Sequence, residues 1–66
     1  MKLQARANLT IDGQQQKFCW RYVGLKDGKF TLGMYPSMAA DLHAAQVEMA
    51  KIELAKVNHD VREIKA

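Results

Sequence analysis

The sequence of 66 residues has little cysteine, little proline and no long apolar run. Cys19 is the only cysteine, so no internal disulfide can form, which favours a reducing, cytoplasmic setting. No apolar stretch approaches the ~18–20 residues that a membrane-spanning helix needs. The N-terminal residues carry a charge every few positions, which is not typical of a secretory signal. A chain this short has room for one small domain, 1–66, and hardly for a deep catalytic pocket.

Carboxylates are scarce in the first part of the chain. Residues 1–37 contain six lysines and arginines against Asp12 and Asp27, a net charge of +4, whereas residues 38–66 have a net charge of −1. An apolar fraction of 48% indicates a folded core rather than disorder. A basic region joined to a nearly neutral one indicates that the basic region contacts an anionic partner.

The first part of the chain has the alternation of apolar and polar residues that is typical of strands. The expected strands cover about residues 2–11, 17–23 and 29–34. Asp12-Gly13 and Asp27-Gly28 predict turns between them, with Gln14–Gln16 lengthening the first loop. Three strands joined by two loops predict an antiparallel meander whose apolar face must be covered.

The remaining residues predict a helix that covers this sheet. The helix is expected over about residues 38–57, with Ser37 as N-cap, and it extends to 65 if Asn58-His59-Asp60 does not end it. The stripe expected to pack on the sheet is Met38, Leu42, Ala45, Met49 and Ile52. A second stripe, free to pack at the sheet's edge or to bind a protein, is Val47, Ala50, Leu54, Val57, Val61 and Ile64. The predicted fold class is α+β, in the order β-β-β-α.

The face of the sheet that points away from the helix, here called the outer face, is predicted to be rich in cations. Its expected residues are Lys2, Gln4, Arg6, Asn8, Thr10, Lys17, Cys19, Arg21, Val23, Lys29, Thr31 and Gly33, of which five are cations and none is a carboxylate. Lys26, near the second turn, joins the candidates. These residue types bind phosphates and base edges. The alternative is that they form only the solvated side of an amphipathic sheet.

A resemblance to a known family adds to this interpretation. An aromatic and basic run, Phe18-Cys19-Trp20-Arg21-Tyr22, is followed by Lys29–Pro36 with its Leu-Gly-x-Tyr-Pro motif and by an alanine-rich segment. Over roughly residues 17–57 the chain resembles the N-terminal arm-type DNA-binding domain of phage and prophage integrases, which are tyrosine recombinases. It departs from them at Met34, where a basic residue is frequent, and at residues 58–60, where Gly-x-Asp-Pro is expected.

The resemblance implies a three-stranded antiparallel sheet packed on one helix. It also implies insertion of the sheet into the major groove of double-stranded DNA at arm-type sites, in support of DNA integration and recombination. The contacts carried over from the family are Arg21, Lys29 and Thr31, whereas the candidates of residues 2–10 depend on alternation alone. No recombinase catalytic domain is present in these residues, so the segment is expected to be non-catalytic.

Other chemistry is less well supported. Cys19 has no histidine near it in the sequence to activate its thiol. His43 and His59 lack a third ligand in a metal-binding pattern, and no cofactor is expected. The aromatic residues of 18–22 are able to stack on exposed bases, but their shared parity favours the core. The expected partners are double-stranded DNA and, through the helix, other protomers, with no membrane; protein interaction through the second stripe is the alternative function.

Overall fold

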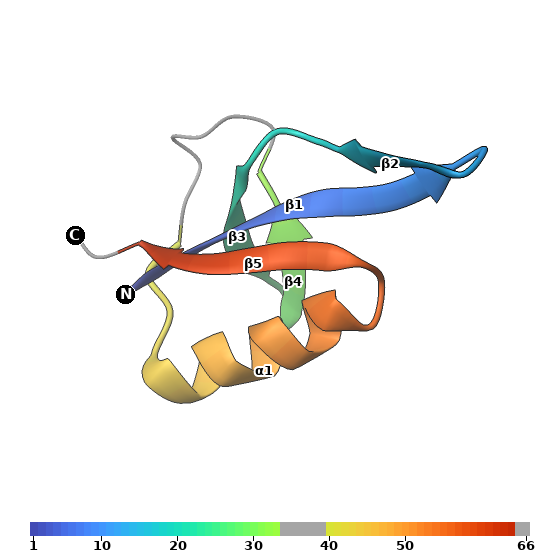
Figure 1. Cartoon of the computed structure of the whole chain (residues 1–66). Coiled ribbons are helices and arrows are strands. Elements are labelled where there is room, and N and C mark those ends of the chain that lie inside the picture. The colour runs from blue at the N-terminus through green and yellow to red at the C-terminus, as the bar shows by residue number, and fades with distance from the viewer. Residues whose placement is uncertain (34–39, 65–66) are drawn as a thin grey trace.

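The computed structural model describes residues 1–33 and 40–64 and confirms the α+β class. Its elements are β1 (Lys2–Ile11), β2 (Gln14–Lys17), β3 (Arg21–Lys26), β4 (Lys29–Leu32), α1 (Ala44–Ala55) and β5 (His59–Ile64). The strands form one antiparallel sheet, curled and covered on one side by α1 (Figure 1). Within the described residues the sheet therefore has five strands, where three were expected.

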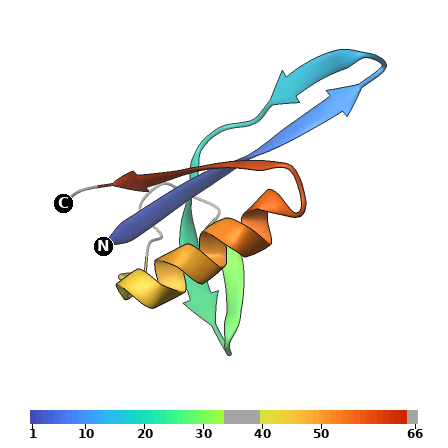
Figure 2. The same cartoon turned by 60° about the horizontal axis from the view of Figure 1, so that its bottom comes forward.

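β1 is the strand to which most of the sheet is attached. β5 pairs with it along Lys2–Ala7, β3 pairs with it at Gln4 and Ala5, and β2 pairs with it along Asn8–Ile11. β1 therefore lies between β3 and β5 in its first part only. Beyond that part, β1 and β2 form a two-stranded ribbon that reaches away from α1 (Figure 2). We call residues 8–17 the ribbon.

Both Asp-Gly turns are present as the sequence predicts. Asp12 and Gly13 have φ of 51° and 79°, and Asp27 and Gly28 have φ of 52° and 76°. Two successive residues with positive φ make the tight turn that suits a hairpin, and glycine adopts this conformation without strain. The prediction that Gln14–Gln16 lengthens the first loop is wrong, because the tight turn reverses the chain at once and pairs these glutamines with β1.

The core lies between α1 and the first part of β1. Its buried residues are Leu3, Ala5 and Val23 from the sheet, Leu42 from the segment before α1, and Val47, Ala50 and Leu54 from α1. Leu25, Phe30, Leu32, Ala40 and Val61 pack around them, so Phe30 and Leu32 face the helix as expected. No helix within residues 1–33 and 40–64 is long and apolar enough to cross a membrane.

The helix is shorter than predicted, and within the described residues it begins at Ala44 rather than near residue 38. Residues 40–43 are not helical, because the Leu42 N–H donates to the carbonyl of Met1 (2.9 Å) and ties this segment to the start of β1. The helix begins after His43, whose N–H donates to Gln46 Oε1 (3.3 Å), an arrangement that satisfies one free donor at the N-terminus. Ser37, the expected N-cap, lies outside the described residues.

The predicted extension of the helix to 65 is wrong. Asn58 has a φ of 59°, a left-handed conformation that asparagine tolerates better than most residues and that ends a helix. The following residues, His59–Ile64, pair with β1 as β5. The sequence pattern failed here because a breaker such as Asn58 is weak on its own and pairing between distant segments leaves no local signal.

The stripe assignment is also reversed. Val47, Ala50 and Leu54 of the second stripe are buried, whereas Met49 and Ile52 of the stripe expected on the sheet are 59% and 60% exposed. Ala45 is exposed, Leu42 alone of that stripe is buried, and Met38 lies outside the described residues. Both stripes have helical spacing, so only the tertiary packing decides which of them is buried.

Candidate nucleic-acid interface

The outer face is defined by the first part of β1, where the odd-numbered residues are buried on the side of α1. Leu3 and Ala5 are fully buried, so the alternating positions Lys2, Gln4 and Arg6 point to the other side of the sheet. Asn8 and Thr10 continue this series into the ribbon, where Lys17 pairs with Asn8. The candidates predicted on β1 and Lys17 are thus on one face, although Gln4 is only 7% exposed.

A bulge separates β2 from β3. β1 pairs with β2 up to Asn8 and Lys17, and it pairs with β3 from Ala5 and Arg21. Two residues of β1 lie between these pairs, against three residues (18–20) of the opposing chain. One extra residue on one strand is a β-bulge, which shifts the register and reverses the faces of the residues that follow.

The bulge overturns the predicted parity of the second strand. Phe18, whose N–H donates to the carbonyl of Ala7 (3.1 Å), and Tyr22, which pairs with Gln4, lie on opposite faces although they are four residues apart. Val23, expected on the outer face, is fully buried in the core. Phe18, expected in the core, is 50% exposed.

Arg21 is the candidate most affected by this reversal. It pairs with Ala5, so it lies on the helix side of the sheet and not on the outer face with Lys29 and Thr31. The prediction that these three residues share one surface is therefore wrong. Arg21 is exposed all the same, beside Phe18 on the edge of a small hollow.

The β3–β4 hairpin adds two lysines and a threonine to the outer face. Lys26 pairs with Lys29, and Gly24 pairs with Thr31. Gly24 lies two residues after Tyr22, which itself lies opposite Gln4, so this series continues the outer face. A Cβ atom at Gly24 would lie 3.2 Å from Thr31 Oγ1, so glycine allows the threonine to lie close against the sheet.

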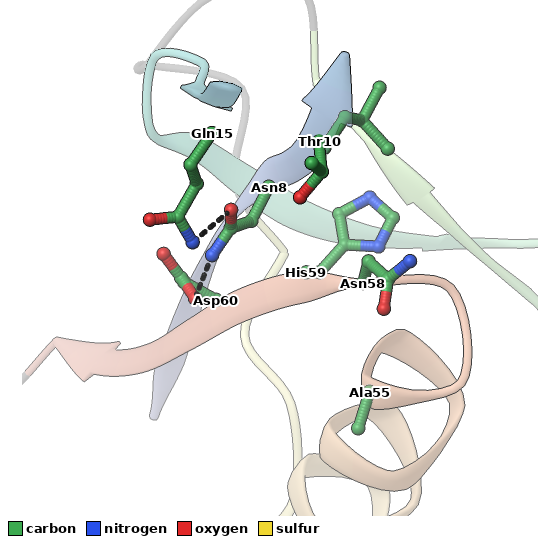
Figure 3. Close-up of a pocket in the computed structure, with 8 residues that line it drawn as sticks. Asn8, Thr10, Gln15, Ala55, Asn58, His59 and Asp60 are labelled. Carbon is green, nitrogen blue, oxygen red and sulfur yellow. Dashed lines mark hydrogen bonds between the residues drawn. The ribbon is translucent and has the colours of Figure 1, made fainter. Parts of the chain in front are cut away.

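β5 places a carboxylate on the outer face. Arg6 Nε donates to Asp60 Oδ2 (2.9 Å), and Asn8 Nδ2 donates to Asp60 Oδ1 (3.1 Å). Gln15 Nε2 extends this chain of hydrogen bonds to Asn8 Oδ1 (2.9 Å), as Figure 3 shows. The hydrogen bond from Asn8, followed by that from Arg6, lowers the pKa of Asp60 below its ordinary value, and the charge of Lys17 adds to this effect.

The prediction of an outer face without carboxylates is therefore wrong. The face nevertheless remains cationic among the described residues. The cations that the pairing places on it are Lys2, Arg6, Lys17, Lys26, Lys29 and Arg62, against the single carboxylate of Asp60. Glu63, the neighbouring acid of β5, pairs with Leu3 on the helix side and bonds to Lys51 of α1, which raises the pKa of that lysine.

Arg62 is the residue that sequence reasoning missed. Its Nε donates to Gln4 Oε1 (2.8 Å), and its guanidinium carbon lies 4.1 Å from the centroid of the Trp20 ring. The guanidinium carbon of Arg6 lies 4.5 Å from the same centroid. Trp20, which was expected in the core, is therefore half-buried on the outer face, in contact with two arginines. Arg62 could not be identified earlier because its segment was assigned to the helix.

The remaining hollows lie at the edges of the sheet. One, of about 520 Å³, opens beside Asn8 where β5 begins, and is lined by Thr10, Gln15, Asn58 and His59 (Figure 3). Another, of about 570 Å³, lies between β4 and α1 and is lined by apolar residues that include Phe30, Leu32, Met49 and Val57. No group of three potential metal ligands occurs in residues 1–33 and 40–64.

Comparison with known proteins finds no matching family model, no matching curated protein and no matching solved structure.

Proposed function

We propose that the chain is a double-stranded DNA-binding module whose outer face lies against the duplex. The observation that carries the proposal is the charge of this face: among the described residues it has six lysines and arginines and a single carboxylate, that of Asp60. Solvated surfaces usually mix both signs, and an excess of one sign attracts an oppositely charged partner. Neutralising DNA phosphates with such cations releases counterions and provides most of the non-specific affinity.

The ribbon supports insertion into the major groove. That groove is about 12 Å wide and admits a two-stranded β-ribbon. The ribbon carries Asn8, Thr10, Gln15 and Lys17 on the outer face, and all of them except Asn8 are exposed. Amide side chains pair with adenine, and threonine contacts the thymine methyl group. In this proposal the ribbon reads base edges and the cations bind phosphates.

The resemblance to integrase arm-type domains gives this module a biological setting. The module would direct a phage or prophage recombinase to its arm-type sites, in the cytoplasm of a bacterial host, and would itself be non-catalytic. Lys29 and Thr31 support this role from the outer face. Arg21, on the helix side of the sheet, would contact the duplex only if the DNA wrapped around that edge.

Salt dependence tests the proposal directly. If about five phosphates are contacted, the logarithm of the binding constant should fall against the logarithm of salt concentration with a slope of roughly −4 to −5. Lys26→Gln and Lys29→Gln should each make the slope less negative by about 0.9. The matched control is Lys56→Gln, at the exposed C-terminal end of α1, which should leave the slope unchanged. Binding that does not depend on salt would contradict the proposal.

The exposed stripe of α1 favours a second candidate function, self-association. Met49 and Ile52 of α1 are 59% and 60% exposed, and Val57, just after the helix, is 57% exposed and lines the same hollow as Met49. Exposed apolar residues of this kind are typical of protein interfaces. The residues first expected in such an interface included Val47 and Leu54, which are buried in the core instead. A second copy of this chain is the partner we propose, because recombinases assemble as multimers on DNA. Analytical ultracentrifugation at high protein concentration, with and without duplex, tests this function. If only monomers are found under both conditions, self-association is excluded.

A further inference from the structure

Arg6 and Arg62 share an unusual arrangement. Each guanidinium group is fixed to the sheet through Nε, Arg6 by Asp60 Oδ2 and Arg62 by Gln4 Oε1. Each also lies over the ring of Trp20. Because each guanidinium carbon lies within 4.5 Å of the centroid of one ring, the two are at most about 9 Å apart, although like charges repel.

The anchoring leaves most of the hydrogen-bond donors of both arginines free. A guanidinium group has five N–H donors in a planar fork, and only the one on Nε is used in each case. Among residues 1–33 and 40–64, neither arginine donates a hydrogen bond from its Nη atoms. Within the part of the chain that the structure describes, eight N–H groups on the two forks therefore remain free, and the protein itself orients both forks.

The local positive charge is only partly compensated. Asp60 is the only carboxylate bonded to this pair within the described residues, and Gln4, the partner of Arg62, is neutral. Lys17 is close enough to lower the pKa of Asp60 as well, so it adds a further positive charge. Because three cations surround one carboxylate, the cluster favours binding of an additional anion.

The site is ordered before any ligand arrives. Gln4 is 7% exposed, and its side chain is part of the packed sheet. Trp20 is half-buried, and contact with its ring restricts the movement of each guanidinium group. Side chains that are already restricted lose less conformational entropy on binding, so the same contacts give a higher affinity.

We propose that Arg6 and Arg62 form a phosphate-binding site that holds a phosphodiester of the DNA backbone between their Nη groups. The proposal rests on the proposed function and identifies which arginines hold the backbone. Arginine forks match the oxygens of a phosphate group in geometry and charge. Both guanidinium groups are held back against the sheet, so they meet the rim of the groove rather than the base edges at its floor.

Trp20 provides a direct probe of this site, because it is the only tryptophan in the chain. Titration of a duplex into the wild-type protein should change the emission of Trp20 as the two arginines in contact with its ring engage a phosphate. Arg62→Gln should weaken binding by roughly 10-fold or more, since hydrogen bonds to charged groups are the strong ones. Arg62→Lys should not restore it, because lysine has no planar fork. Lys26→Gln should weaken DNA binding less than Arg62→Gln does.

A second measurement alters the DNA and compares wild-type protein with Arg62→Gln; its first observation, on the wild-type protein, does not depend on the folding of any variant. In a set of duplexes, one phosphate at a time is replaced by a neutral methylphosphonate. One position should weaken wild-type binding, and that loss should disappear in Arg62→Gln. If all positions have the same effect in both proteins, the phosphate site is wrong, even if steep salt dependence upholds DNA binding.

Inorganic phosphate tests the phosphate site independently of DNA binding. If it changes Trp20 emission in the wild-type protein but not in Arg62→Gln, while no duplex binds, the phosphate site stands and the DNA-binding function is wrong. If neither duplex nor phosphate affects Trp20, the phosphate site is overturned.

Discussion

The two halves of β1 have the same alternation and opposite surroundings. Leu3 and Ala5 are fully buried, whereas Leu9 and Ile11, in the same series, are 39% and 49% exposed. The first half lies between β3 and β5 under α1, and the second half pairs with β2 alone (Figure 2). The difference teaches that alternation assigns a side to each residue, but only the neighbouring elements decide whether that side is buried.

The largest effect should come from exchanging leucine for alanine in each half. Leu3→Ala removes a fully buried side chain and should cost about 2–5 kcal/mol of unfolding free energy, much of the total for a small domain. Leu9→Ala is the matched control and should cost far less, because its site is already hydrated. Urea denaturation followed by circular dichroism measures both. Equal losses would mean that the ribbon contributes to the core.

Substitutions at the two turns should show a second difference in stability between the ribbon and the part of the sheet that packs on the core. Gly13→Ala and Gly28→Ala each introduce a side chain at a positive φ, which costs roughly 1–2 kcal/mol. No atom lies within 4 Å of either added Cβ, so strain is the whole effect. Gly28→Ala should lower global stability, because β4 packs on the core.

The corresponding change at Gly13 should loosen the ribbon only. Hydrogen exchange should quicken at amides of β2 while the amides of β1 that face β5 stay protected. Exchange that quickened across the whole sheet would contradict the independence of the two halves.

At the junction of the halves, Asp60→Asn should increase DNA affinity. The change removes the carboxylate from the outer face while keeping an oxygen that accepts from Arg6 or Asn8. One charge near a phosphate is worth about 1 kcal/mol in water, or about fivefold in affinity. Glu63→Gln, on the helix side, is the control and should leave affinity unchanged. An unaltered affinity for Asp60→Asn would place the duplex away from this surface.

The smallest effect concerns acid stability at the same junction. Asn8 and then Arg6 hold the pKa of Asp60 below its ordinary value. The carboxylate therefore stabilises the fold above the ordinary aspartate range, and this stability is lost as the pH falls through the lowered pKa. Wild-type protein should exceed Asp60→Asn in stability at neutral pH, with the difference shrinking below about pH 4. Urea midpoints across this range measure it.

Local features of the fold could be predicted from the sequence. The bounds of β1, Lys2–Ile11, follow from alternation, and both Asp-Gly turns lie where they were expected. Phe30 and Leu32 face the helix as their parity indicates. These features depend on neighbouring residues only, and so a pattern along the chain contains them.

Features that depend on distant residues could not be predicted. Counting alternate positions does not detect one inserted residue, so the bulge at 18–20 reversed the expected faces of Arg21 and Val23. Asp60 meets Arg6 across a separation of 54 residues, which no local period records. The predicted composition of the outer face therefore lacked the two residues that matter most for its chemistry, Asp60 with its carboxylate and Arg62 with its guanidinium group.

Because β1 pairs with β5, folding of this small domain depends on contact between two strands that are far apart in the sequence. The β1–β2 and β3–β4 hairpins close over a few residues and can form early, but Lys2 finds Ile64 only after nearly the whole chain has been brought back. Such non-local pairing slows folding, because the entropy of closure is lost before the contact is gained. A circular permutant that joins residues 64 and 2 by a short linker, with new ends at the tip of the ribbon, would turn this slowest contact into a hairpin.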